Sequence, residues 1–194
     1  MNYSDTATED AILLAVQHVL AGDKEAFRKI VETYKDSLYR YCLTRIGNEE
    51  RAKDLVQEIF IRAYRSLPTF KLGRQFGPWI FTIASNVLRS SWRRTTREQA
   101  MTSHLFYPED PEQENPENNM LQRETQREVV RALRNLPHEL YEVLYLYYFE
   151  GLSVSEIAKT LELEEENIKS RLFRGRKKLR KILQPETPKK GIIG

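Results

Sequence analysis

The chain has one cysteine, three histidines and no long apolar run, and each scarcity excludes a class of protein. A lone Cys42 cannot form an internal disulfide and offers no thiolate cluster for zinc. No segment approaches the ~18 apolar residues that a membrane span requires, and the N-terminus lacks the basic start and apolar run of a signal peptide. We therefore expect a cytoplasmic protein in a reducing compartment, without membrane insertion.

Signatures of catalysis and of cofactor binding are also missing. His18, His104 and His138 lie far apart in the sequence, and no nucleotide-binding loop of the form GxxxxGK[ST] occurs. The sequence therefore predicts a protein that is not an enzyme, with no catalytic residue, no metal site and no cofactor.

Helical periodicity, by contrast, runs through most of the 194 residues. Apolar residues recur with a period of 3.6 over 24–46, which ends at Gly47, and again after a predicted cap at Asn48. A third amphipathic helix is predicted over 76–95, and no convincing alternating strand is present. These patterns predict an all-α fold.

An acidic, proline-containing segment interrupts the helical pattern. Three prolines between positions 108 and 116 and many acidic residues disfavour both a helix and a core there. We therefore expect two small helical domains joined by a linker. The predicted boundaries are an N-terminal domain over 1–96, the acidic linker over 97–121, a C-terminal domain over 122–184 and a tail over 185–194.

The C-terminal domain contains the stretch "LSVSEIAKTLELEEENIKSRLFRGRKKL". Ser153 stands three residues before Glu156, as in a capping box, and Asn167 is placed to cap the basic helix that follows. This pattern predicts a helix-turn-helix, whose second helix enters the major groove of DNA. A two-helix packing motif with a solvated basic face is the structural alternative.

Phe173 favours the DNA-binding interpretation. It lies off the apolar stripe of the basic helix, on the half that carries the charges. Arginine can bond guanine through two hydrogen bonds, an aromatic ring can touch a thymine methyl group, and lysines can meet phosphates. Base reading is assigned to Lys169, Ser170, Phe173 and Arg174, and phosphate contacts to residues such as Arg176 and Lys177. The predicted DNA-binding residues are Lys169, Ser170, Arg171, Phe173, Arg174, Arg176 and Lys177.

The predicted helix 76–95 carries a polar line opposite its apolar stripe. Three aromatic residues, Trp79, Phe81 and Trp92, flank this line, and rings beside arginines favour unstacked nucleotides. The alternative is that the tryptophans belong to the core and the arginines are merely solvated. The polar line consists of four residues, and we call it the strand-following line: Thr82, Asn86, Arg89 and Arg93.

The outward face of the second predicted helix combines acidic and amide residues with an isoleucine. An exposed isoleucine beside acidic residues is better suited to protein docking than to DNA binding, although isolated exposed apolar residues are common. We call this set the docking face: Asp54, Gln57, Glu58 and Ile61.

Three motifs together resemble a known family. The stretches "DLVQEIFIRAYRSLPTF", "FGPWIFTIASNVL" and "LSVSEIAKTLELEEENIKSRLFRGRKKLRK", in this order and separated by a linker, are similar to the group 4 (extracytoplasmic-function, ECF) bacterial sigma factors. The resemblance covers about residues 20 to 183. It implies a subunit that directs core RNA polymerase to promoters and nucleates melting, without catalysis of its own.

The resemblance also assigns roles to the three surfaces. The docking face would bind the clamp coiled coil of RNA polymerase. The sigma factor would also contact the flap of the polymerase. Phe70 and Asn86 would capture a base flipped from the non-template strand of the minus-ten element. The other residues of the strand-following line would contact the same element. The helix-turn-helix would read the minus-thirty-five element, with Phe173 and Arg174 in the groove. An anti-sigma factor is a further expected partner.

The turn of the helix-turn-helix departs from the family. Glu162 stands where the family commonly has glycine, and "EEEN" at 164–167 replaces the usual short lead to the second helix. Two other functions stay open at this point. One is an autonomous repressor or activator with the same DNA-binding motif, and the other is a basic helix lying on an anionic membrane.

Overall fold

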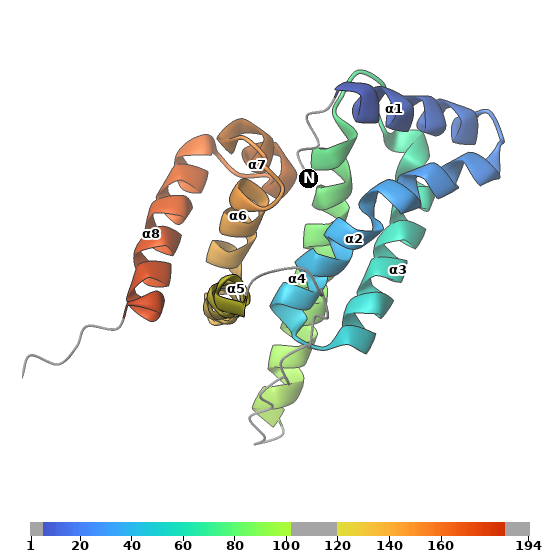
Figure 1. Ribbon diagram of the computed structural model, residues 1–194. Helices are drawn as coiled ribbons and strands as arrows, with labels where there is room; N and C mark the ends of the chain where they lie inside the picture. The colour runs from blue at the N-terminus through green and yellow to red at the C-terminus, as the bar shows by residue number, and fades with distance from the viewer. Residues whose placement is uncertain (1–5, 102–119, 185–194) are drawn as a thin grey trace, which may run out of the picture.

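The structure is a computed structural model, and it describes residues 6–101 and 120–184, with side chains over 7–94 and 127–184. All regular elements in these ranges are helical, which confirms the predicted fold class (Figure 1). The N-terminal part comprises α1 (Thr6–Leu20), η1 (Lys24–Ala26), α2 (Phe27–Ile46), α3 (Glu49–Ser66), η2 (Leu67–Thr69) and α4 (Phe76–Met101). The C-terminal part comprises α5 (Met120–Arg134), α6 (His138–Tyr148), α7 (Val154–Leu161) and α8 (Glu165–Leu183).

The predicted boundary between α2 and α3 is confirmed in detail. Gly47 ends α2 in the left-handed conformation, with φ of 69°, and its N–H donates to the carbonyl of Leu43. Asn48 then caps α3, because its side chain accepts from the backbone N–H of Arg51 at 2.9 Å. Cys42 is fully buried in the same core, and burial raises the pKa of its thiol to about 12. That thiol is therefore a packing group and not a nucleophile.

Helix α1 was not predicted from the sequence, although it contributes Ile12 and Val16 to the core. It also supplies a long-range cap. The carboxylate of Glu9 accepts a hydrogen bond of 2.7 Å from the backbone N–H of Phe76, at the start of α4. The pKa of Glu9 is raised, mainly because the carboxyl group is partly buried, although the hydrogen bond from this N–H acts in the opposite direction. A negative charge at this helix end also suits the helix dipole.

Helix α4 is longer than predicted. It continues to Met101 instead of ending at Thr95, because the segment after Trp92 holds no proline or glycine that would end the helix. The first five residues of the predicted 97–121 linker are thus helical, and α5 begins at Met120. The rest of the linker, 102–119, and the tail, 185–194, lie outside the described residues.

The C-terminal helices pack closely because α8 has a glycine where it meets α6. A Cβ atom placed on Gly175 would lie 2.9 Å from Cδ1 of Leu144 and 3.1 Å from its Cγ, closer than normal contact allows. Gly175 is also buried on the apolar stripe with Ile168 and Leu172. The apolar stripe predicted for the basic helix is confirmed at these three positions, but Ile182 and Leu183, predicted on the same stripe, are exposed near the end of the helix.

Gly175→Ala should therefore destabilise the protein, although alanine is the better helix former. We expect overpacking to lower the free energy of unfolding by about 1–3 kcal/mol, partly offset by about 1 kcal/mol of helix propensity. Urea denaturation followed by circular dichroism measures the net change. Adding Leu144→Ala should cost less in the Gly175→Ala background than in the wild type. A Gly175→Ala variant more stable than the wild type would contradict the close approach.

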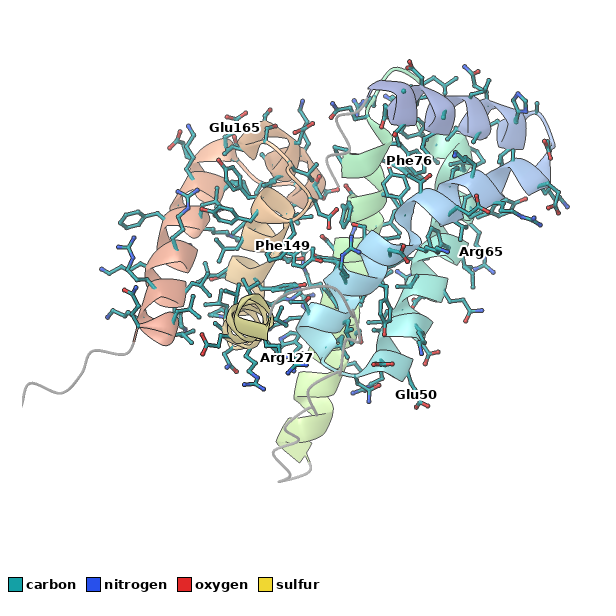
Figure 2. The ribbon with its side chains drawn as sticks, viewed as in Figure 1. Glu50, Arg65, Phe76, Arg127, Phe149 and Glu165 are labelled. Atoms are coloured by element: carbon teal, nitrogen blue, oxygen red, sulfur yellow. The ribbon has the colours of Figure 1, made fainter. Side chains whose placement is uncertain are left out.

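The two groups of helices pack against each other. Helix α4 contacts α7, and α2 contacts α5 (Figure 1). Side chains fill the space between α4 and α6 (Figure 2), where Arg89 of α4 donates to the carboxylate of Glu142 on α6. The surfaces predicted to bind partners are thus displayed on two domains that contact each other directly.

Candidate nucleic-acid and polymerase interfaces

The helix-turn-helix forms as the sequence predicts. Both halves of the capping box are present at the start of α7, where Ser153 and Glu156 exchange side-chain to backbone hydrogen bonds. Glu162 ends α7 in the left-handed conformation, with φ of 55°, and it is the only non-glycine described with a positive φ. Such a position favours glycine, which explains why a glutamate here departs from the pattern. The next residue closes the turn, because the N–H of Leu163 donates to the carbonyl of Ala158 at 2.9 Å.

The predicted cap of α8 is wrong by a few residues. Helix α8 begins at Glu165 with Glu164 as its N-cap, because the left-handed residue turns the chain earlier than an Asn167 cap would require. Asn167 instead lies in the first turn, where its side-chain oxygen accepts from Nε of Arg171 at 2.9 Å. The acidic first turn, Glu165 and Glu166, suits the positive end of the helix dipole.

The outward face of α8 carries an unusual exposed aromatic residue. Phe173 is 68% exposed, although the neighbouring Leu172 is buried. Ser170, Arg174 and Lys177 are exposed on the same helix. The sequence prediction that Phe173 points away from the fold is therefore confirmed.

Three other cations of α8 have protein partners. Nζ of Lys169 lies 2.6 Å from a carboxylate oxygen of Glu166, and this hydrogen bond raises the pKa of Lys169. Arg171 is mostly buried and lies 3.8 Å from the carboxylate of Glu139 on α6. Arg176 is exposed, and its Nε donates to the Tyr148 hydroxyl at 2.8 Å. The six predicted DNA contacts other than Arg171 lie at the surface of α8.

The docking face lies on one side of α3. Asp54 and Gln57 are exposed, and Ile61 is 45% exposed, as the sequence predicts. Glu58 is half-buried and forms an ion pair with Arg62 one turn further along the helix. Acidic, amide and apolar groups are thus presented together on one rigid helix.

The strand-following line on α4 is only partly accessible. Asn86 and Arg93 are exposed, and Thr82 is half-buried, with its hydroxyl donating to the carbonyl of Pro78 at 2.9 Å. Arg89 turns toward α6, where its Nη2 lies 3.3 Å from each carboxylate oxygen of Glu142. The line is continuous along the helix, but one of its two arginines is held by the C-terminal domain.

The aromatic residues near this line lie in the protein interior or in ring contacts. Phe81 is fully buried against Tyr41, so the prediction that it flanks an exposed polar line is wrong. Trp92 lies under the guanidinium of Arg45, 3.7 Å from the ring centre. Phe70 is only 6% exposed and packs edge-on against Trp79, with 5.3 Å between ring centres.

Two absences concern the described part of the chain. None of its helices combines the length and apolar character needed to cross a membrane. In the same residue ranges, no three histidine, cysteine, aspartate or glutamate side chains are grouped so that they could hold a metal ion.

Comparison with known proteins assigns a family to both groups of helices. The family model of Sigma-70 region 2 matches residues 30–98, and the family model of Sigma-70, region 4 matches residues 126–179. The ECF RNA polymerase sigma factor SigW of Bacillus subtilis is 30% identical over 177 residues, which cover 87% of this chain and 95% of SigW. The chain belongs to the ECF sigma factors. As a sigma factor it directs RNA polymerase to promoters for transcription initiation, and this family is not catalytic.

Other relatives agree with this assignment. The ECF sigma-E factor of Escherichia coli is 32% identical over 178 residues, covering 88% of this sigma factor and 93% of its relative. Among solved structures, the sigma factor RpoE of Bartonella quintana, in complex with the anti-sigma factor NepR, aligns with a TM-score of 0.70. That alignment covers 83% of this chain and 98% of RpoE at 22% identity, so it supports the fold.

Proposed function

We propose that this sigma factor reads the minus-thirty-five element through α8, holds the minus-ten element on α4 and binds core polymerase through the docking face. The observation that carries this proposal is the 68% exposure of Phe173 on a helix lined with cations. A large aromatic ring gains little by facing water, so its position is explained by a surface that receives it. Promoter DNA, with its thymine methyl groups and phosphates, is such a surface.

The roles along α8 follow from which side chains reach the surface. Ser170, Phe173 and Arg174 are placed to touch base edges, and Lys177 to touch phosphate. Lys169 would have to leave Glu166 in order to contact DNA, and the loss of that ion pair lowers its net contribution to the binding free energy. Arg171 supports α8 from behind through Asn167 and Glu139, and so positions the reading residues. Arg176 is anchored by Tyr148 with its guanidinium near the helix surface, which suits a phosphate contact.

The minus-ten contacts are divided between exposed and buried groups. Asn86 and Arg93 are available to a separated strand, and Thr82 lies one turn before Asn86. Phe70 would form the inner wall of the base pocket, since it packs on Trp79 in the core. Arg89 would join these contacts only after leaving Glu142.

The partners follow from the same surfaces. The docking face suits the clamp coiled coil of core polymerase, and the C-terminal domain suits its flap. Such a protein acts in the cytoplasm, where polymerase and promoters are. The solved structure of the sigma factor RpoE in complex with the anti-sigma factor NepR leads us to infer an anti-sigma factor as a further partner.

Charge reversal on the docking face tests the polymerase assignment. Asp54→Lys with Glu58→Lys should reduce capture of core polymerase at least tenfold, because like charges replace complementary ones across the contact. A matched control is Glu32→Lys with Asp36→Lys, two exposed acidic residues with the same spacing on α2. Immobilised core polymerase and titrated sigma factor give the affinity. Equal affinities for the two double variants would refute the docking assignment.

A further inference from the structure

The loop that leads into α4 has both of its ends in the aromatic core. Phe70 follows η2 at the start of the loop, and Phe76 begins α4 at its end. Both rings are buried, and their centres lie 5.3 Å apart. The residues between them, 71–75, are exposed, and Gly73 turns the chain with φ of 94°. The loop is therefore an exposed turn whose two ends meet in one buried ring contact.

This ring contact includes Phe70, the inner wall of the proposed base pocket. Trp79 completes the contact, with its ring centre 5.3 Å from that of Phe70 and 5.0 Å from that of Phe76. Asn86 lies further along the same helix, in which the rise per residue is fixed. The place where α4 begins therefore sets the distance between the Asn86 amide and the wall formed by Phe70.

The start of α4 is held by a side chain of α1. The first N–H groups of a helix have no partner within it, and Phe76 provides the first of them in α4. Oε1 of Glu9 accepts a hydrogen bond of 2.7 Å from this N–H. An N–H of a buried residue costs folding free energy when it has no partner. Helix α1 also contacts η2, so it holds the segments on both sides of the loop.

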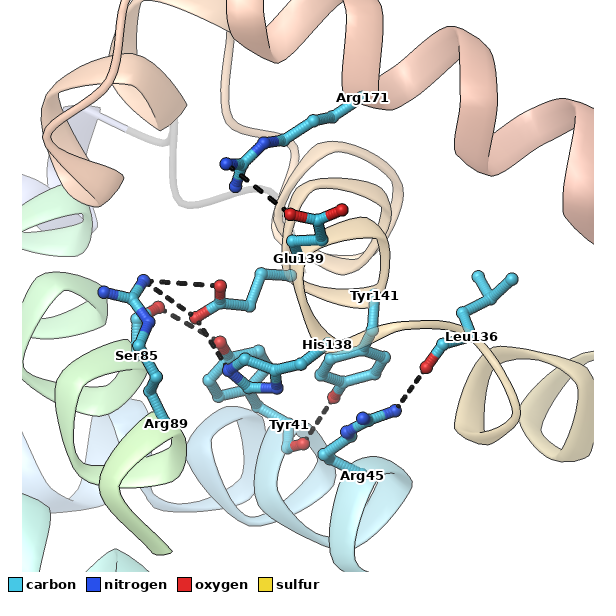
Figure 3. Close-up of polar contacts among 10 residues, drawn as sticks. Tyr41, Arg45, Ser85, Arg89, Leu136, His138, Glu139, Tyr141 and Arg171 are labelled. Carbon is cyan, nitrogen blue, oxygen red and sulfur yellow. Dashed lines mark hydrogen bonds and ion pairs between the residues drawn. The ribbon is translucent and has the colours of Figure 1, made fainter. Parts of the chain in front are cut away.

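Helix α4 is also held further along, by a contact of a different kind. Nη2 of Arg89 lies 3.3 Å from each carboxylate oxygen of Glu142, which belongs to the C-terminal domain (Figure 3). That ion pair must break before Arg89 can contact DNA. The hydrogen bond from Phe76 to Glu9 lies within the N-terminal domain, so it can persist while DNA is bound.

We propose that Glu9 is a positioning residue for the base pocket, because it holds the start of α4 and the loop 71–75 against Phe70 before DNA arrives. This inference rests on the proposed function, since it concerns the same minus-ten pocket. Glu9 is half-buried and acts through Phe76, without touching DNA itself. A pocket that is formed in advance loses less free energy when it captures a flipped base.

A purely structural role for α1 makes a different prediction. Val16 is fully buried on the same helix, and its truncation removes packing while the hydrogen bond from Phe76 to Glu9 is kept. If α1 only stabilises the domain, Val16→Ala should slow promoter melting at least as much as Glu9→Ala does. If Glu9 positions the pocket, only Glu9→Ala should slow promoter melting.

The test follows open-complex formation by holoenzymes that contain the full chain, using permanganate reactivity of thymines in an intact promoter. Glu9→Ala should slow this step about three- to tenfold, since one hydrogen bond is lost. Glu9→Gln should keep the wild-type rate within about twofold, because its amide oxygen can accept the same hydrogen bond. The matched control Asp10→Ala changes the exposed acidic residue next to Glu9 and should leave the rate unchanged. Val16→Ala should lower the urea midpoint at least as far as Glu9→Ala does and should also leave the rate unchanged.

Amide hydrogen exchange in the free chain tests the contact without DNA. The Phe76 N–H should exchange slowly in the wild type and in Asp10→Ala, and about tenfold faster in Glu9→Ala, because its acceptor is then missing. Exchange of the wild-type Phe76 N–H at the rate of an unstructured peptide would overturn the inference, even if Glu9→Ala does not fold.

Asn86→Ala separates this inference from the proposed function. If Asn86→Ala melts the promoter at the wild-type rate, the proposed base pocket itself is wrong. If Asn86→Ala slows melting and a folded Glu9→Ala does not, only the positioning role of Glu9 is wrong. The positioning role is also overturned if Val16→Ala slows melting as much as Glu9→Ala does.

Discussion

Arg174→Ala in the polymerase holoenzyme should lower affinity for a promoter with a matched minus-thirty-five element by about 5- to 150-fold, which corresponds to about 1–3 kcal/mol. Arg174 is exposed on α8 beside Phe173, on a helix held rigidly by the close approach of Gly175 to Leu144. A guanidinium in this place can bond guanine through two hydrogen bonds, and no other side chain restores that geometry.

Lys177→Ala is the matched comparison on the same helix. Lys177 is exposed about one turn further along. We expect it to contact phosphate, so its loss should weaken binding to all DNA sequences alike. The salt slope of binding should fall by about one for Lys177→Ala. Competition binding on matched and mismatched promoters, repeated over a range of salt, separates the two effects. Equal losses for Arg174→Ala on both promoters would show that Arg174 does not read bases.

Asn86→Ala should leave closed-complex binding largely intact and slow open-complex formation at least tenfold. Flipping a base out of the duplex costs a few kcal/mol, and the pocket must offset that cost. Asn86 is exposed at the centre of the strand-following line, so the substitution removes a surface amide and no core contact. Phe70→Ala is unsuitable for this purpose, because Phe70 is 6% exposed and its truncation would cost about 3–5 kcal/mol of folding stability.

Permanganate reactivity of unpaired thymines measures melting in this variant. The Asn86→Ala holoenzyme is compared with the wild type on an intact promoter and on one premelted across the minus-ten element. The defect should shrink on the premelted template, although some loss will persist, because the pocket also holds the separated strand. Wild-type thymine reactivity on the intact promoter would show that Asn86 takes no part in melting.

Local features of this sigma factor could be predicted from the sequence because they depend on neighbouring residues. Gly47 and Asn48 define the boundary between two helices through their own backbone and side-chain geometry. The exposure of Phe173 and Ile61 follows from their positions off an apolar stripe. Periodicity therefore predicts which face of a helix is buried.

Periodicity does not predict which distant segment covers that face. Arg89 and Glu142 are 53 residues apart, and nothing in either helix alone shows that they form an ion pair. Glu142 and Glu150, buried acidic residues within a mainly apolar stretch, were the available signal of a polar interface. The burial of Phe81 and Phe70 was not predicted for the same reason, since the rings that they pack against belong to other elements.

Run-off transcription with purified core polymerase, on a pool of random promoters, tests the central claim most directly. The sigma factor should produce transcripts from a subset of templates that share one minus-thirty-five element and one minus-ten element at fixed spacing, whereas core polymerase alone should not. The docking-face variant Asp54→Lys with Glu58→Lys should lose these transcripts. No enrichment over core polymerase alone, together with tight and sequence-specific duplex binding by the free protein, would contradict the account.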